Sequence, residues 1–130
     1  MEQLANFING KFIQPKSEKY IDVFEPATGQ VYSKVPNSSS ADINVAFQAA
    51  NSAFPRWSEL TVTDRSQYLH KIATLLESQL DDFADYESRD TGKPVTLAQS
   101  VDIPRAIANF RFFGEYGPTF KFNSELNSDQ

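Results

Sequence analysis

A helix that is apolar around most of its circumference constrains this chain more than any other feature of the sequence. The helix is expected over about residues 96–116 and contains the stretch DIPRAIANFRFF. At about 100° per residue its apolar side chains fall on two faces, one with Ile103, Ile107, Phe110 and Gly114 and the other with Val101, Ala108 and Phe112. Such a helix is normally buried against several partners, so any fold for this chain must cover both faces.

A narrow polar strip interrupts this apolar surface. Asp102, Arg105 and Asn109 lie together on the strip, whereas Arg111 lies on the far side of the helix and is expected to be structural. Pro104 fits neither end of the helix, which predicts a kink that helps to aim Arg105.

The first third of the chain predicts a small antiparallel strand unit. FINGKFI contains two short apolar runs around Asn9-Gly10, a dipeptide that favours the positive φ angles of a type I′ hairpin turn. Two more strands are expected over 20–24 and 31–35, because Pro26 and Gly29 between them favour a turn.

The rest of the chain predicts three or four helices. In the first, Ser39 and Asp42 have the spacing of a capping box, and Pro55 is expected to end the helix. The apolar stripe between them consists of Ile43, Ala46, Phe47, Ala50 and Phe54.

The next helical segment is capped by Thr61 and Asp64 and is expected to end near Gly92, with a break near 79–82. Its stripe consists of Leu69, Ile72, Ala73, Leu76, Leu80, Phe83 and Ala84.

The predicted fold class is therefore α/β, with a strand segment over 1–36, a helical part over 37–117 and a polar tail over 118–130. No strand is expected after the helices to close a core. This layout predicts the front part of a larger domain that is incomplete here. For the isolated chain it predicts poor stability, or self-association through exposed apolar helix surface.

The composition narrows the function classes. A formal net charge of −5 and a pI near 4.8 argue against binding to nucleic acid or to an anionic membrane, because both need a basic face. The longest apolar run is far shorter than the roughly 20 residues of a membrane span, and the N-terminus is not that of a secretory signal, so a cytoplasmic location is expected. The absence of cysteine removes thiolate nucleophiles and thiolate zinc sites.

Most catalytic constellations are missing from the sequence. The only histidine, His70, lies beside an apolar stripe without a nucleophile motif, which favours ordinary packing over catalysis. TGKP lacks the first glycine of a phosphate-binding P-loop, because that position is Glu87, and no Gly-x-Gly-x-x-Gly occurs. From its residues alone, the chain is either an interaction module or part of an enzyme.

Five stretches together resemble the N-terminal part of the aldehyde dehydrogenase superfamily. They are FINGKF, FEPATGQVYSKVP, AFQAANSAFPRWSEL, DRSQYLHKIATLLESQLDDFADYESRDTGKP and ANFRFF, in this order over about residues 7–116. The stretch ESRDTGKPVTLAQSVDIPRAIANFRFF is most similar to the branch that acts on 2-aminomuconate or 2-hydroxymuconate semialdehyde.

This resemblance implies the front part of an NAD-binding domain in an enzyme that oxidises an aldehyde through a cysteine thiolate. The family's catalytic Cys, Glu and Asn and its nucleotide-binding segment lie downstream of the residues present here, so no catalytic or cofactor-binding residue is assigned. The expected function is the N-terminal portion of an NAD-dependent semialdehyde dehydrogenase, not catalytic by itself, with an aldehyde substrate and a homo-oligomer in the intact enzyme. The alternatives are a truncated, non-enzymatic subunit that associates with full-length aldehyde dehydrogenase, or a free-standing domain with a new binding role.

The resemblance also implies two sites in an intact enzyme. Family members often hold a structural sodium or potassium ion, and the matching ligands are the Asp90 carboxylate and the Phe24 backbone carbonyl. The alternative is that Asp90 only helps to end its helix. Arg105 matches a position in the substrate tunnel, where it would hold a substrate carboxylate. The alternative is an intrahelical pair with Asp102, worth about 0.2–0.5 kcal/mol.

Overall fold

The computed structural model describes residues 2–120, in which short strands are followed by helices. The strands are β1 (Glu2–Gln3), β2 (Asn6–Ile8), β3 (Lys11–Ile13), β4 (Tyr20–Glu25) and β5 (Gln30–Pro36). The helices are α1 (Ser40–Ser58), α2 (Val62–Ser78), α3 (Leu80–Thr91), α4 (Val95–Leu97), the π-helical segment η1 (Ala98–Asp102), α5 (Ile103–Tyr116) and the 3₁₀ turn η2 (Gly117–Thr119). This order confirms the predicted α/β fold class. Of the predicted polar tail, residues 121–130 lie outside the described residues.

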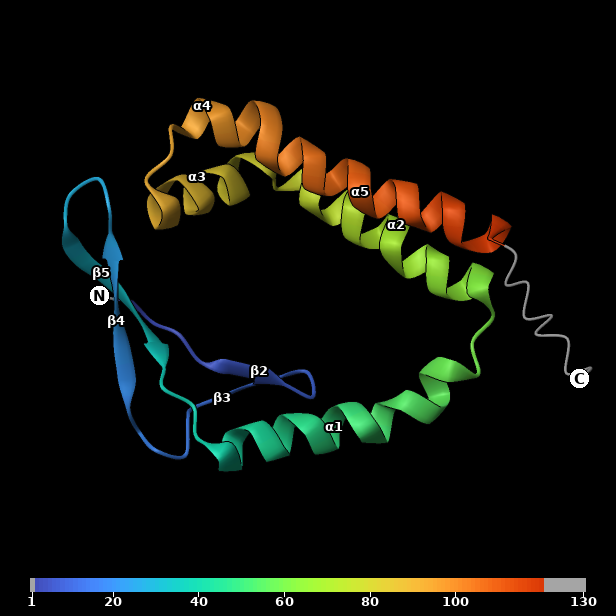
Figure 1. Cartoon of the computed structure of the whole chain (residues 1–130), viewed down its shortest axis with the longest axis horizontal. Helices are drawn as coiled ribbons and strands as arrows, with labels where there is room; N and C mark the ends of the chain where they lie inside the picture. Colours follow the sequence, from blue (N-terminus) through green and yellow to red (C-terminus); the bar gives the residue numbers. More distant parts are fainter. Residues whose placement is uncertain (1, 121–130) are drawn as a thin grey trace, which may run out of the picture.

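Figure 1 shows how these elements are arranged. β1, β4 and β5 lie at one end of the molecule, α1 runs along one side with the β2–β3 hairpin next to it, and α2 and α5 lie side by side along the other. The loop between α1 and α2 joins the two sides at the end far from the sheet. None of the helices in residues 2–120 is long and apolar enough to cross a membrane.

The strands form two separate sheets. β4 and β5 pair antiparallel, and β2 pairs antiparallel with β3, as predicted. Asn9 and Gly10 both have positive φ, 52° and 73°, which the predicted type I′ turn requires. β1 adds a parallel strand to β5 that the sequence did not predict, because a two-residue strand carries no readable periodicity.

The capping box at the start of α1 is present. The Asp42 carboxylate accepts hydrogen bonds from the Ser39 backbone N–H and hydroxyl, both at 2.7 Å, and from the Lys16 backbone N–H at 2.8 Å. These bonds, first of all the one from Lys16, lower the pKa of Asp42 because they favour its charged form. The cap therefore also ties the chain before β4 to the start of α1.

The prediction that Pro55 ends this helix is wrong, because α1 continues to Ser58. Proline removes one helical hydrogen bond and its ring clashes with the carbonyl four residues earlier, so a further turn forms only if other contacts stabilise it. Here the ring of Trp57 packs edge-on against Tyr68 of α2 at 5.2 Å between ring centroids. The Glu59 N–H also donates to the Pro55 carbonyl. Tertiary packing thus outweighs the local signal of the proline.

The apolar stripe of α1 finds no cover among the described residues. Ile43, Phe47 and Phe54 are each more than 60% exposed. This helix contacts β2 of the small β2–β3 hairpin, and Trp57 near its end packs against Tyr68 of α2. The stripe therefore forms an apolar surface rather than part of a core.

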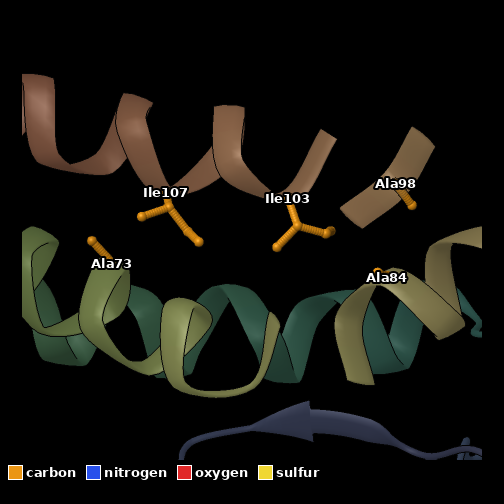
Figure 2. Close-up of a cluster of buried hydrophobic side chains, with 5 residues drawn as sticks. All are labelled: Ala73, Ala84, Ala98, Ile103 and Ile107. Atoms are coloured by element: carbon orange, nitrogen blue, oxygen red, sulfur yellow. The ribbon is translucent and has the colours of Figure 1, made fainter. Parts of the chain in front are cut away.

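The core lies between α2, α3 and the last helical stretch, as Figure 2 shows. Its buried side chains are Ala73, Ala84, Ala98, Ile103 and Ile107, and Leu76, Leu80, Val95 and Phe110 pack against them. Ile103, Ile107 and Gly114 are buried, as expected for the first apolar face of the last helix. On its second face, Val101 and Phe112 stay 44% and 55% exposed.

α2 and α5 cross closely at Gly114. The Ser66 hydroxyl donates a 2.6 Å hydrogen bond to the Gly114 carbonyl, and a Cβ at Gly114 would lie 2.9 Å from His70 Nε2. His70 therefore packs against the facing helix, which supports the structural interpretation of the single histidine.

The irregularity expected at Pro104 takes the form of the π-helical segment η1. The Ile103 N–H donates to the carbonyl of Ala98, five residues earlier. In a regular α-helix two residues five apart would lie about 140° from each other, yet both are buried in one core. The π turn brings them onto the same side. Pro104 favours it, because a proline ring clashes with the carbonyl four residues before it.

Candidate functional site

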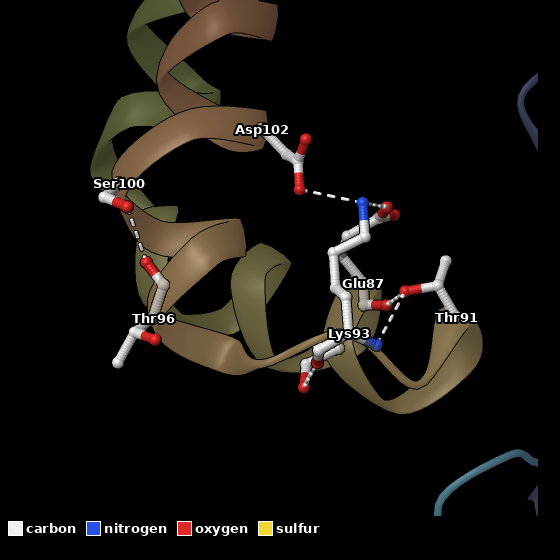
Figure 3. A network of polar contacts seen from close by, with 7 residues as sticks. Glu87, Thr91, Lys93, Thr96, Ser100 and Asp102 are labelled. Atoms are coloured by element: carbon white, nitrogen blue, oxygen red, sulfur yellow. Dashed lines mark hydrogen bonds and ion pairs between the residues drawn. The ribbon is translucent and has the colours of Figure 1, made fainter.

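A cluster of three charged side chains, hereafter the Lys93 cluster, lies where α3 meets η1. Lys93 Nζ is 2.8 Å from Asp102 Oδ2 and 2.9 Å from Glu87 Oε1. Figure 3 shows the Lys93 ammonium group lying between these two carboxylates. About 30% of the Lys93 and Asp102 side chains is exposed (27% and 30%). The hydrogen bonds to Asp102 and then to Glu87 raise the pKa of Lys93, because they favour the ammonium form.

The backbone of Lys93 is held independently of its ammonium group. The Ser88 hydroxyl donates a 2.7 Å hydrogen bond to the Lys93 carbonyl, and Gly92 closes α3 in the left-handed conformation with a φ of 77°. The turn predicted from Gly92 thus places the Lys93 side chain next to Asp102.

Arg105 lies three residues after Asp102, near the start of α5, and is exposed. No hydrogen bond or ion pair reaches its guanidinium within residues 2–120. The intrahelical pair with Asp102 is not formed, because the Asp102 carboxylate is bound to Lys93 instead. Sequence reasoning missed Lys93, whose only signal is a cation placed just after a helix-ending Gly92.

Arg111 has a partner of a different kind. Its guanidinium pairs with the Glu77 carboxylate and so joins α5 to α2. This contact across two packed helices agrees with the structural role expected for Arg111. Of the two arginines, Arg105 is the one without a partner in the described part of the chain.

Asp90 lies at the end of α3, next to the sheet. Its carboxylate accepts a 2.9 Å hydrogen bond from the Tyr32 hydroxyl on β5, and the Arg89 guanidinium lies 4.4 Å from the centre of the Tyr32 ring. Burial, and then the hydrogen bond to Asp90, raise the pKa of Tyr32. Arg89 Nε is also 3.6 Å from Glu25, the residue that follows Phe24 on β4.

The sodium or potassium site predicted at Asp90 and Phe24 would use oxygen ligands. Within residues 2–120 no three His, Cys, Asp or Glu side chains gather as a metal-binding group. One carboxylate with backbone carbonyls is a set of hard oxygen donors, which suits sodium or potassium. Asp90 of α3 and the carbonyls of β4 lie on elements that contact each other.

Two of the hollows formed by residues 2–120 lie elsewhere on the molecule. One of about 500 Å³ is lined mainly by apolar side chains of α2 and α5, together with Trp57 and Phe120. A larger one of about 770 Å³ lies between the β2–β3 hairpin and α1. Arg105 lines neither of these two hollows, and neither contains a nucleophile with a general base.

The aldehyde dehydrogenase family pattern matches residues 12–129, and the chain belongs to this family. Among curated proteins it is 50% identical to the 2-aminomuconic semialdehyde dehydrogenases of Danio rerio and Homo sapiens, over 110 residues that are 85% of this chain and 22% of each relative. It is 37% identical to the 2-hydroxymuconic semialdehyde dehydrogenase of Pseudomonas sp. (strain CF600), over 88% of this chain and 24% of that protein. The chain thus spans about a fifth of the length of the curated relatives it matches.

Solved structures agree with this assignment. A complex of aldehyde dehydrogenase from Bacillus cereus with NAD⁺ superimposes with a TM-score of 0.83 at 33% identity, over 88% of this chain and 24% of that one. PnpE in complex with nicotinamide adenine dinucleotide gives a TM-score of 0.88 at 33% identity, over 92% of this chain and 24% of the PnpE chain. The resemblance predicted from the sequence is therefore confirmed at the level of family and fold.

Proposed function

We propose that this chain is the N-terminal, substrate-recognising part of a cytoplasmic, NAD-dependent dehydrogenase that oxidises a carboxylate-bearing semialdehyde to a dicarboxylic acid. The observation that carries the proposal is the exposed Arg105, unpaired within residues 2–120 beside an Asp102 that is already bound. The similarity to 2-aminomuconic semialdehyde dehydrogenases, about 50% identity, supports the choice of substrate class.

In this proposal Arg105 holds the carboxylate at the end of the substrate remote from the aldehyde. A guanidinium binds a carboxylate through two parallel charge-assisted hydrogen bonds, which fixes both position and orientation. The chain has no cysteine that could act as the nucleophile and no Gly-x-Gly-x-x-Gly motif, so we derive no chemical step from its residues. Aldehyde oxidation, NAD binding and homo-oligomer formation belong to the intact enzyme.

A second candidate function is a non-enzymatic subunit that associates with a full-length aldehyde dehydrogenase. The observation that favours it is the uncovered apolar stripe of α1, with Ile43, Phe47 and Phe54. Copurification of this chain with the full-length Danio rerio relative, together with a change in the activity of that relative, would support the subunit. Separate elution of the two would exclude it.

A segment exchange tests the substrate-recognising role. In the chimera, the 110 matched residues of this chain replace the corresponding segment of the Danio rerio 2-aminomuconic semialdehyde dehydrogenase. We expect kcat/KM for 2-hydroxymuconate semialdehyde to exceed that for hexanal by about ten-fold or more, because only the first substrate can pair with Arg105.

The control exchange uses the matching segment of acetaldehyde dehydrogenase 2 from Cupriavidus necator, which is 35% identical to this chain. An active control chimera should lose the preference for the charged substrate. If both chimeras show the same preference, recognition of the carboxylate lies outside this segment and the proposal fails.

We also propose that Asp90 and the Phe24 carbonyl bind a structural sodium or potassium ion in the intact enzyme. The thermal midpoint of the chimera should be higher in potassium or sodium chloride than in choline chloride at equal ionic strength. Asp90→Asn should abolish this difference, since it removes the charge but keeps an acceptor for Tyr32. Tyr32→Phe is the matched control and should retain it. An unchanged ion response in Asp90→Asn would refute the site.

A further inference from the structure

We propose that Lys93 is a positioning residue for substrate recognition, which keeps Arg105 available by binding the carboxylate of Asp102. The inference rests on the proposed role of Arg105 and adds the reason why its guanidinium is unpaired. It concerns the side chains of Lys93, Asp102 and Arg105. Figure 3 shows the contact between the first two.

Asp102 is the natural competitor of the substrate for Arg105. Residues three apart on a helix are neighbours, so Asp102 and Arg105 have the spacing of an intrahelical ion pair. An internal pair would occupy the guanidinium and would have to break before a substrate carboxylate could bind. In the structure this does not happen, since Asp102 Oδ2 lies 2.8 Å from Lys93 Nζ.

The position of Lys93 favours its binding to the Asp102 carboxylate over the binding of Arg105 to it. Its ammonium group also lies 2.9 Å from Glu87, and its backbone is fixed by the Ser88 hydroxyl, so little freedom is lost when it binds Asp102. Part of the cluster is screened from water, with 27% of the Lys93 side chain exposed, which makes the pair stronger than an open surface pair.

The charges near Arg105 show what the loss of Lys93 would do. The Lys93 cluster carries one positive and two negative charges, and hence a net charge of −1. Without the ammonium group the net charge becomes −2. The carboxylate of Asp102 is then free to pair with Arg105, and the local field repels an incoming anion more strongly.

Lys93→Met in the chimera tests this directly. We expect KM for 2-hydroxymuconate semialdehyde to rise about two- to five-fold, the range for competing exposed or helical ion pairs, with a much smaller change in kcat. KM for hexanal should stay within error. Lys34→Met is the matched control, because Lys34 pairs with Asp22 at 3.1 Å on the sheet and should leave both KM values unchanged.

Two second-site variants separate positioning from a merely structural role. Asp102→Asn added to Lys93→Met should restore the low KM, because the neutral amide no longer competes for Arg105. The single variant Lys93→Arg should also keep the low KM for the charged substrate. If Lys93→Met raises KM for both substrates equally, or if Asp102→Asn fails to rescue a folded double variant, the positioning role is overturned.

Lys93→Met introduced into the Arg105→Ala variant tests the role of Lys93 separately from the proposed function of Arg105. There, Lys93→Met should no longer affect KM for the charged substrate, because the group it protects is gone. A specific effect of Arg105→Ala combined with no effect of Lys93→Met would refute only the role of Lys93. Equal losses for both substrates in Arg105→Ala itself would refute the proposed function.

Discussion

Replacement of Arg105 by alanine in the chimera should lower kcat/KM for 2-hydroxymuconate semialdehyde by about 10- to 100-fold, the range expected when a charge-assisted carboxylate contact of about 1.5–3 kcal/mol is lost. The same change should alter kcat/KM for hexanal by less than about two-fold, since an uncharged aldehyde makes no such contact. Steady-state rates of NADH formation with both substrates measure the difference.

Arg105→Lys is the informative intermediate variant. Lysine keeps the positive charge but lacks the planar pair of donors. Compared with Arg105→Ala, it should therefore recover part of the affinity for the charged semialdehyde but less of the control over the orientation of this substrate. A lysine variant indistinguishable from wild type would mean that charge alone is needed. Arg111→Ala is the matched control: it removes an arginine from the same helix and the ion pair with Glu77, and it should affect both substrates alike.

The family and the order of elements could be predicted from the sequence because they depend on local signals. The cap at Thr61 and Asp64 is present, and the Gly92 turn is left-handed as expected. The break between α2 and α3 falls at Gln79, inside the predicted range. Each of these features is decided by a few neighbouring residues, so the printed sequence contains enough to place it.

The features that the sequence did not predict depend on contacts between distant segments. Pro55 remains inside α1 while Trp57 packs on Tyr68, eleven residues further along the chain. The apolar stripe of α1 was predicted from its periodicity alone, and periodicity says only which residues share a face and not whether anything covers them. With Phe47 and Phe54 each 62% exposed, the pattern was correct and its cover is missing from residues 2–120.

Only part of the candidate site could be predicted, for the same reason. Arg105 was predicted as a candidate from its position in a polar strip and from the family resemblance. Its relation to Asp102 was not, because the helical spacing that suggests a pair between them cannot reveal that Lys93 binds the same carboxylate. The turn at Gly92 brings this lysine into place, so the conformation of one glycine connects the fold to the site.

Gly92→Ala should therefore be among the most disruptive small substitutions in this chain. Gly92 has a φ of 77°, a conformation that costs an L-residue about 1–2 kcal/mol. In addition, a Cβ at this position would lie 2.9 Å from Cβ of Pro26, in the turn between β4 and β5. That ring cannot rotate away, so the total loss should reach about 2–4 kcal/mol. The thermal midpoint of the chimera, followed by circular dichroism, measures it.

Gly29→Ala separates the two causes. Gly29 has a similar φ of 68°, but nothing lies within 4 Å of a Cβ built there, so this variant suffers only the backbone strain. Gly92→Ala should lower the midpoint clearly more than Gly29→Ala does. Equal shifts would mean that the contact with Pro26 is unimportant.

Pro26→Gly completes the cycle, because it removes the Cβ that an alanine at position 92 would meet. The double variant Pro26→Gly/Gly92→Ala should be more stable than the sum of the two single effects predicts, which identifies a direct contact. If the contact also holds the turn that carries Lys93, Gly92→Ala alone should raise KM for the charged semialdehyde, and the added Pro26→Gly should lower it again. A recovery of stability without a recovery of KM would show that the packing of α3 on the β4–β5 turn supports the fold but does not position the site.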